Sequence, residues 1–391
     1  MAKTHDRRNT VIVILLAVIY VIVAMSDNLK GILVPTFKDN FGVDDRGISV
    51  LLMSAMLSYA IFQFFSGLLI ERLGFKRCLY MGAAIGSGSL LIIMTSRSFI
   101  QLVCGMFLLN TGMALFNVVV NSLGPILHVA STAVVMNVIH GCYSGGNGLI
   151  QFVSGKLLAR NVPWPYLYGA MLVGLVIVFI ILIPTPISYK AGGESEPLDR
   201  STRRAIHRQP ILYILIGTMA TYLGTTYGMG NWFINYMAEM YNFGSYERGL
   251  YMTAFVLLRV VGLFTGGFIA DRLGLYRSMI IYAAVAMLSL FGGTILGRHG
   301  LWLISASGLA FAVVYPGVVT TVKKVFPKGS AYAMGFILTG ATLIAMLISG
   351  FMGVLNSYLD AYRSFFMLPL CMFITFLLCI VIKRHMATKP A

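Results

Sequence analysis

The feature that most limits how this chain can fold is a series of long apolar segments joined by short polar ones. The hydrocarbon core of a bilayer is about 30 Å thick, so a helix needs about 20 apolar residues to cross it. Hydrophobic residues form 58% of the chain and charged residues only 11%, whereas a soluble domain has roughly 25% charged residues. The sequence therefore predicts an integral membrane protein. Twelve segments qualify as spans: 11–37, 48–70, 78–96, 99–126, 133–158, 164–184, 210–238, 248–271, 278–297, 300–325, 330–357 and 363–383.

Two sequence patterns occur once in each half of the chain. SGLLIERLGFKR at Ser66–Arg77 matches GGFIADRLGLYR at Gly266–Arg277. NFGVDDRG at Asn40–Gly47 matches NFGSYERG at Asn242–Gly249. Because both pairs have nearly the same offset, the chain is interpreted as a duplication. We therefore predict an all-α integral membrane fold in which twelve transmembrane helices form two pseudo-symmetric six-helix bundles.

The domain boundaries follow from a polar segment between the sixth and seventh spans. We predict an N-terminal bundle at 1–184, a cytoplasmic linker at 185–209 and a C-terminal bundle at 210–391. Lys and Arg concentrate on the side that holds both termini and this linker, which predicts that all three are cytoplasmic. The same bias explains the net charge of +16 without a nucleic-acid partner. The expected location is the inner or plasma membrane, with the lipid bilayer as a partner and the chain as a monomer.

The repeated turn between the second and third spans of each half is the predicted gate. Its first glycine would allow close helix contact, its second a sharp turn, and its arginines would hold the turn at the headgroups. Its acid would meet the positive amino end of a neighbouring helix across the domain interface. A simple basic anchor loop is the alternative, which two copies in register disfavour. The gating residues are Gly67, Glu71, Arg72, Gly74 and Arg77, and Gly267, Asp271, Arg272, Gly274 and Arg277.

Few charged residues fall inside the predicted spans, and charges at that depth are costly and usually functional. Asp27 and Lys30 are three residues apart on one helix face, so two interpretations compete. They form a local ion pair, or Asp27 is desolvated with a raised pKa and carries a coupling proton. Arg259 either binds an anionic substrate group or pairs with Asp27 as a structural lock.

Polar residues at helical spacing predict a hydrogen-bonding cavity, with interhelical hydrogen bonding as the alternative. The fifth span carries one such stripe and the fourth span another. The seventh span mixes aromatic and amide side chains, which suits a sugar with its apolar ring faces and hydroxyl edges; the alternative for its aromatic residues is the interfacial aromatic belt. Its glycines would let that helix bend or unwind, and a Tyr-Pro-Gly sequence predicts a kink in the tenth span. With the charged residues, the candidate substrate-binding set is Asp27, Lys30, Asn117, Asn121, His140, Tyr143, Asn147, Gln151, Tyr227, Asn231, Trp232, Asn235, Arg259 and Tyr315.

The repeated turn resembles the loop signature of the major facilitator superfamily, and the resemblance extends to the helix count, the linker and the duplication. Three segments further resemble the fucose-permease type of sugar–proton symporters: NLKGILVP at Asn28–Pro35, MNVIHGCYSGG at Met136–Gly146 and GMGNWFINY at Gly228–Tyr236. This resemblance implies a sugar-like substrate.

The same alignment shows that the acids usual in the fucose-permease type are absent. The acid of the first helix falls on Gly31, that of the fourth on Asn117 and that of the seventh on Thr226. Asp27 lies one turn before Gly31 on the same face and is the candidate substitute for proton coupling.

The first functional hypothesis is a secondary active transporter that moves a sugar or sugar derivative by alternating access, with a proton as the candidate coupling ion. The alternatives are a small organic anion transporter, by symport or antiport, and an exporter of amphipathic drugs. An enzyme is not expected, because no nucleophile–base pair, metal cluster or cofactor loop is evident. We expect a small-molecule substrate, no cofactor and no metal.

Overall fold

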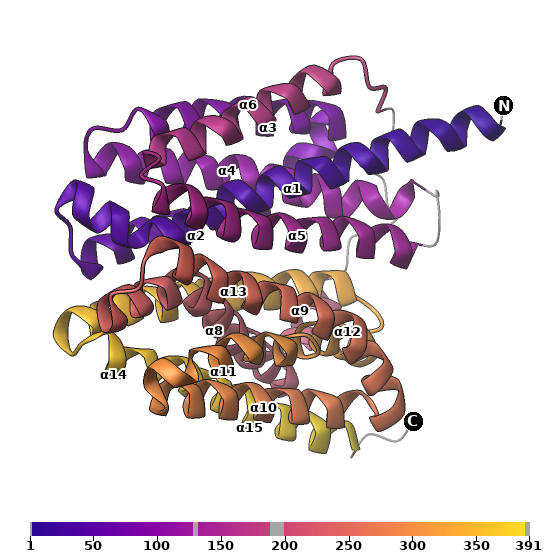
Figure 1. Cartoon of the computed structure of the whole chain (residues 1–391). Coiled ribbons are helices and arrows are strands. Elements are labelled where there is room, and N and C mark those ends of the chain that lie inside the picture. Colours follow the sequence, from indigo (N-terminus) through magenta and orange to yellow (C-terminus); the bar gives the residue numbers. More distant parts are fainter. Residues whose placement is uncertain (1, 128–131, 188–198, 388–391) are drawn as a thin grey trace. The chain divides into compact units, whose positions relative to one another are not determined.

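The computed structural model describes residues 2–127, 132–187 and 199–387, and every regular element in those ranges is helical (Figure 1). The first half contains α1 (Ala2–Phe41), α2 (Asp45–Leu73), α3 (Phe75–Met94), α4 (Phe99–Leu123), η1 (Gly124–Ile126), α5 (Thr132–Ala159) and α6 (Trp164–Leu182). A short helix, α7 (Arg200–His207), follows. The second half contains α8 (Pro210–Tyr241), α9 (Ser245–Leu273), α10 (Leu275–Ile295), η2 (Gly297–Gly300), α11 (Leu301–Ala306), η3 (Ser307–Phe311), α12 (Val314–Val325), α13 (Ser330–Tyr358), α14 (Ala361–Phe365) and α15 (Met367–Ala387).

Each of the twelve predicted spans corresponds to a helix or to a run of consecutive helices. Within the described part of the chain, ten of them are long and apolar enough to cross a membrane. The other two, α5 and α8, are 28 and 32 residues long, which is ample length, but α5 carries a polar stripe and α8 a mixture of amide and aromatic side chains, so both are less apolar. The prediction of an all-α, twelve-helix membrane fold is confirmed.

The chain forms two compact units. Unit 1 comprises Met1–Val43, Val50–Gly193 and Gly244–Leu250, and unit 2 comprises Asp44–Ser49, Glu194–Phe243 and Tyr251–Ala391. Each unit thus draws mainly on one half of the sequence and includes one short segment from the other half. The predicted domain boundaries at 184 and 210 stay a prediction, because 188–198 lie outside the described residues.

Unit 1 is built by helices that approach each other at small residues. Helix α1 packs against α4, α5 and α6, and α3 packs against α4 and α6. Gly146 of α5 lies against α1 so closely that a Cβ there would be 2.8 Å from the Val21 oxygen. Gly112 of α4 meets Gly82 and Gly86 of α3 in the same way, with a Cβ 3.0 Å from backbone atoms of both. Small residues at such crossings give the close contact that holds membrane helices together.

Unit 2 has α8 at its centre, packed against α13 and α15, while α10 packs against α15. The predicted unwinding of α8 is wrong, because one helix runs unbroken through its glycines, while the predicted bend stays a prediction. Two of these glycines serve packing. A Cβ on Gly224 would be 2.9 Å from the Ile348 side chain, and one on Gly228 would be 2.3 Å from Leu368.

The tenth span is broken, but earlier than predicted. Helix α11 ends at Ala306, η3 covers Ser307–Phe311, and α12 begins at Val314. Pro316 therefore lies in the first turn of α12, where a missing backbone N–H costs no hydrogen bond. The interruption precedes the Tyr-Pro-Gly sequence and brings the 3₁₀ backbone of η3 against α9, as described for the site below.

The second part of the predicted linker forms a short helix, α7. Helix α7 buries Ile206, and the His207 Nε2 lies 2.9 Å from the Tyr332 hydroxyl at the start of α13. The Arg203 guanidinium lies over the same Tyr332 ring, with its carbon 5.4 Å from the centroid. This half of the linker is thus attached to unit 2.

The second glycine of each repeated turn has the sharp-turn backbone conformation that the sequence predicts. Gly74 (φ 80°, ψ 165°) and Gly274 (φ 83°, ψ 144°) directly precede α3 and α10, in a region open essentially to glycine alone. The first glycine is different: outside its own helix, no atom of the described residues lies within 4 Å of a Cβ built on Gly67 or Gly267, so the close helix contact expected there stays a prediction. The first turn is instead held by Lys76, whose Nζ donates to the Ile183 oxygen at 2.9 Å, at the negative carboxyl end of α6.

These two glycines form a matched test in one turn. Gly74→Ala is expected to lower the free energy of unfolding by about 1–3 kcal/mol, because alanine is strained at this φ and ψ. Gly67→Ala, inside α2 and in open space, should be neutral or stabilising by up to about 1 kcal/mol. Thermal unfolding of both purified variants in detergent measures the difference, and equal melting temperatures would contradict this account of the turn.

Candidate functional site

A cluster of polar and aromatic side chains joins α1, α4 and α5 in unit 1. The Asn121 Nδ2 donates to the Tyr20 hydroxyl at 2.8 Å and to the Asn117 Oδ1 at 3.0 Å. The Tyr20 ring meets the rings of His140 and Tyr143 edge to face, with a centroid distance of 5.6 Å in each case. The structure thus brings together four residues that the sequence placed on two separate stripes.

Tyr20 is the residue that connects them, and sequence reasoning missed it. A single tyrosine in a long apolar helix gives little signal, because tyrosine is often buried in packing. A signal was nevertheless present: Tyr20 lies seven residues, or two helical turns, before Asp27 and so shares its face of α1. The two residues are separated by about 10 Å along the helix axis.

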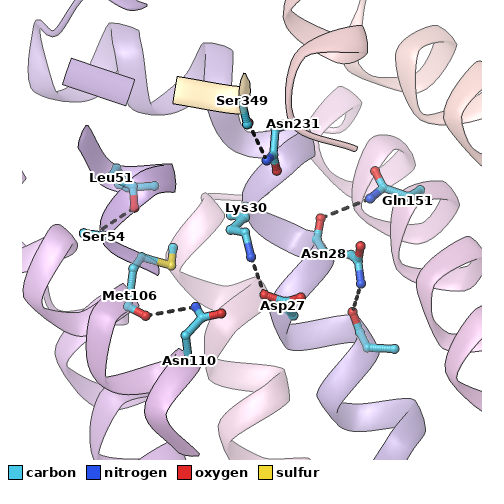
Figure 2. Close-up of polar contacts among 11 residues, drawn as sticks. Asp27, Asn28, Lys30, Leu51, Ser54, Met106, Asn110, Gln151, Asn231 and Ser349 are labelled. Carbon is cyan, nitrogen blue, oxygen red and sulfur yellow. Dashed lines mark hydrogen bonds and ion pairs between the residues drawn. The ribbon is translucent and has the colours of Figure 1, made fainter. Parts of the chain in front are cut away.

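Asp27 and Lys30 contact each other as an ion pair on α1 (Figure 2). The Lys30 side chain is 10% exposed and that of Asp27 28%. In this structure, therefore, the local ion pair is the alternative that the contacts support, and Lys30 neutralises the charge that Asp27 brings into the membrane. Figure 2 shows both side chains beside Asn28 of the same helix.

Farther along α5, two amide side chains have oxygen atoms that receive no hydrogen bond from the described residues. The Gln151 Nε2 donates to the backbone oxygen of Asn28 at 3.0 Å, which joins α5 to α1 (Figure 2). The Gln151 Oε1 has no hydrogen-bond partner among the described residues, and the same holds for the Asn147 Oδ1 one turn away. A buried acceptor without a donor costs about 1–3 kcal/mol, so these two oxygens are a place where a ligand or water would be stabilised.

In unit 2, Arg259 of α9 is half-buried and its Nη2 donates to the Tyr222 hydroxyl of α8 at 3.5 Å. The Tyr222 hydroxyl in turn donates to the backbone oxygen of Phe311 at 2.5 Å. Tyr315, four residues after Phe311, is 36% exposed. Tyr227 is partly exposed on α8.

Three predicted residues of α8 are committed to packing within unit 2. Trp232 is fully buried, and its Nε1 donates to the Ser349 backbone oxygen of α13 at 3.0 Å. The Asn231 Nδ2 lies 3.4 Å from the Ser349 hydroxyl, and the Asn235 Nδ2 donates to the Asp45 carboxylate at 3.3 Å. These contacts are hydrogen bonds within unit 2, and Trp232 has no exposed ring face in this structure. Substrate binding by these residues stays a prediction.

Most charged side chains of the two repeated turns are exposed on the surface. Arg72, Arg77, Asp271, Arg272 and Arg277 are exposed, and the Asp271 carboxylate has no hydrogen bond or ion pair within the described ranges. The Glu71 side chain lies outside the described part of the chain. Next to the first turn is a hollow of about 570 Å³, lined by Leu73, Gly74, Phe75, Lys76, Arg77, Tyr80 and Ile187. The gating role of these residues stays a prediction.

No group of three or more His, Cys, Asp or Glu side chains capable of holding a metal ion occurs within residues 2–127, 132–187 and 199–387.

Curated proteins similar to this chain include the protein TsgA homolog of Yersinia enterocolitica, 24% identical over 210 residues, which are 52% of each chain. The TsgA homolog of Yersinia pestis is 23% identical over the same length. The chain thus matches about half the length of these relatives.

Solved structures share the fold over nearly the whole chain. FucP in the outward conformation has a TM-score of 0.69 at 16% identity, covering 96% of this chain and 99% of FucP. A bacterial homolog of the human lysosomal transporter Spinster, inward-facing and occupied, has a TM-score of 0.80 at 14% identity. The match covers 98% of this chain and 99% of the homolog. A D-xylose–proton symporter has a TM-score of 0.75 at 14% identity, and the match covers 95% of this chain and 96% of the symporter. The resemblance to the fucose-permease type is confirmed at the level of the fold.

The family comparison accounts for both halves of the sequence. The model of the Major Facilitator Superfamily matches residues 16–297 and 214–390. The repeated turns, the twelve spans and the fold agree with this match. The chain belongs to the Major Facilitator Superfamily.

Proposed function

We propose that the chain is a secondary active transporter of a small polar solute, a sugar or sugar derivative, that works by alternating access. The observation that carries this proposal is the cluster of Tyr20, Asn117, Asn121, His140 and Tyr143 in unit 1. It combines aromatic rings with amide groups on three membrane helices. A sugar ring has apolar faces that pack on aromatic rings and hydroxyl edges that bond to amides, so the chemistry of the cluster and of a sugar is complementary.

The unsatisfied acceptors of α5 support the same substrate class. The buried Asn147 Oδ1 and Gln151 Oε1 can accept hydrogen bonds but receive none from the described residues. Sugar hydroxyls are donors of the required kind. An amphipathic drug offers few such donors, so these oxygens disfavour the drug-exporter alternative.

The relatives are consistent with this class without defining the substrate. FucP is described as a fucose–proton symporter, and the other similar structures include a D-xylose–proton symporter and the nucleoside transporter NupG. All of these likenesses are at 14–16% identity. For this chain, the sugar-like substrate and proton coupling through Asp27 are therefore our proposals.

The proposed driving force is an ion gradient. Moving one elementary charge across 100 mV supplies roughly 2.3 kcal/mol, which corresponds to about 50-fold accumulation when one charge accompanies each substrate. We further propose that both termini are cytoplasmic, on the basis of the Lys and Arg distribution, and that the chain works as a monomer.

The proposal is tested by counterflow. Proteoliposomes that contain the purified chain are loaded with one unlabelled sugar at high concentration, and uptake of the same labelled sugar is followed without any imposed gradient. A panel of hexoses, pentoses, 6-deoxyhexoses and sugar acids is expected to contain at least one compound that enters transiently above its equilibrium level. Protein-free liposomes are the control. Absence of counterflow for the entire panel would contradict the proposed substrate class.

A further inference from the structure

We propose that Arg259 binds an anionic group of the substrate, so that the transported solute is a sugar derivative bearing a carboxylate or a phosphate rather than a neutral sugar. This inference rests on the proposed function and makes its substrate class narrower. It is argued from unit 2 alone, because the residues that position Arg259 all belong to that unit.

Arg259 lacks an acidic partner among the described residues of unit 2. Its hydrogen bond to the Tyr222 hydroxyl is long, at 3.5 Å, and no carboxylate of the described residues of unit 2 lies within 4.0 Å of its guanidinium. By contrast, Lys30 in unit 1 has Asp27. A cation at membrane depth is costly unless an anion compensates it, and the described residues of unit 2 supply none beside Arg259.

Tyr222 directs an oxygen toward Arg259. Its hydroxyl proton is committed to the Phe311 backbone oxygen at 2.5 Å, so the phenolic oxygen faces the guanidinium as an acceptor. Tyr222 is fully buried, and its ring packs against the ring of Phe311 with a centroid distance of 5.9 Å. This arrangement orients the guanidinium and neutralises none of its charge.

The backbone of α9 is fixed on both sides of Arg259. A Cβ on Gly308 of η3 would be 2.2 Å from the Phe255 oxygen and 3.2 Å from the Arg259 nitrogen. One turn later, a Cβ on Gly262 would be 2.3 Å from the Leu309 oxygen. The 3₁₀ segment therefore packs backbone to backbone against α9, and the break in the tenth span places this rigid support next to Arg259. A binding group is effective when it is held by rigid elements in this way.

Most N–H donors of the Arg259 guanidinium remain available to a ligand. A guanidinium has five N–H donors in a planar fork, and the described residues use one of those of Arg259, in a long bond to a neutral phenol. The others match two oxygens of a carboxylate or phosphate, which arginine binds in bidentate fashion. A neutral sugar would leave this charge uncompensated. The same guanidinium also distinguishes this site from one built only of amides and aromatic rings.

The test measures binding by ligand-induced shifts in thermal unfolding of the purified full chain, supported by counterflow. The probes are D-glucose, D-glucuronate, the methyl ester of D-glucuronate and D-glucose 6-phosphate, with the corresponding galactose compounds. The acid or the phosphate should bind at least about tenfold more tightly than both neutral compounds, equivalent to ~1.4 kcal/mol. The methyl ester is the matched neutral control for the acid, and comparison of the acid with the phosphate identifies the anion.

Variants of Arg259 then assign the preference to this residue. Arg259→Gln should abolish the preference for the anionic probe, and Arg259→Lys should keep the charge but lose about tenfold in affinity, because lysine cannot form the bidentate pair. If Arg259→Gln gives no folded protein, the Arg259→Lys measurement alone decides. Arg298→Gln changes an exposed arginine in the same unit and should retain the full preference.

The outcomes separate this inference from the proposed function. Neutral sugars that bind or exchange as well as the anionic probes, or a preference that survives in Arg259→Gln, would overturn the role of Arg259 and leave sugar transport standing. An affinity for the anion that is equal in Arg259→Lys and the unmodified chain would also overturn it. No response to any probe, in binding and in counterflow, would overturn the proposed function and this inference with it.

Discussion

Replacing Lys30 by Met is expected to lower the free energy of unfolding by about 3 kcal/mol, because it leaves the Asp27 carboxylate without its partner. Breaking a buried ion pair costs about 3–5 kcal/mol, and the lower end applies here because the Asp27 side chain is 28% exposed. Thermal or chemical unfolding of the purified variant in detergent measures the loss. Expression level alone is not sufficient, because poor insertion would also reduce it.

The matched control is the double variant Asp27→Asn with Lys30→Met, which removes both charges. It should be more stable than Lys30→Met alone, because no unpaired charge remains in the helix. A complete double-mutant cycle with Asp27→Asn gives the coupling energy of the pair. Equal stability of the single Lys30→Met variant and the double variant would show that the ion pair has no part in stability.

Asp27→Asn is the change with the largest expected effect on transport. Asparagine keeps the shape of aspartate and can still accept a hydrogen bond from Lys30, but it cannot bind and release a proton. If Asp27 carries the coupling proton, the variant should lose accumulation of substrate against a gradient completely, while exchange of labelled for unlabelled substrate continues. Both activities are measured in proteoliposomes with the substrate that counterflow identifies.

Asp199→Asn is the control for this variant, since Asp199 is exposed just before α7 and outside the membrane spans. It should leave both accumulation and exchange unchanged. Accumulation that persists in Asp27→Asn would rule out the coupling role of Asp27 and leave the ion pair with Lys30 as its function. Loss of both activities, with a lowered melting temperature, would indicate a structural role instead.

The fold was predictable because membrane insertion imposes strong constraints on sequence. Each span needs about 20 apolar residues, and a duplicated turn marks the same place in both halves. The backbone of Gly74 and Gly274 was predictable for the same kind of reason: a helix that ends and restarts within one residue requires a conformation open essentially to glycine. These requirements depend on residues close together in the chain, so they can be inferred from the sequence.

The side-chain contacts were less predictable, because they depend on which helix face meets which neighbour. Trp232 and Asn231 belong to the aromatic and amide side chains of α8 that suit a sugar, yet both bond to Ser349 of α13, 117 and 118 residues away in sequence. Gly67 was predicted to be a packing glycine, but the close crossings described within unit 1 are at Gly146 and Gly112. Tyr20 was missed because its partners, Asn121 and His140, come from two other helices. Helical spacing identifies a face and cannot identify what that face contacts.

The most direct test of the central claim, gradient-driven transport of a sugar or sugar derivative, is accumulation in sealed proteoliposomes that contain only the purified chain. An inside-negative potential and an inside-alkaline pH gradient are imposed with no ATP present, and the labelled compound identified by counterflow is added. We expect the internal concentration to rise well above the external one, up to about 50-fold at 100 mV for each net positive charge that enters with a substrate molecule, and to fall when an ionophore dissipates the gradient. Equal internal and external concentrations under the full gradient would contradict secondary active transport.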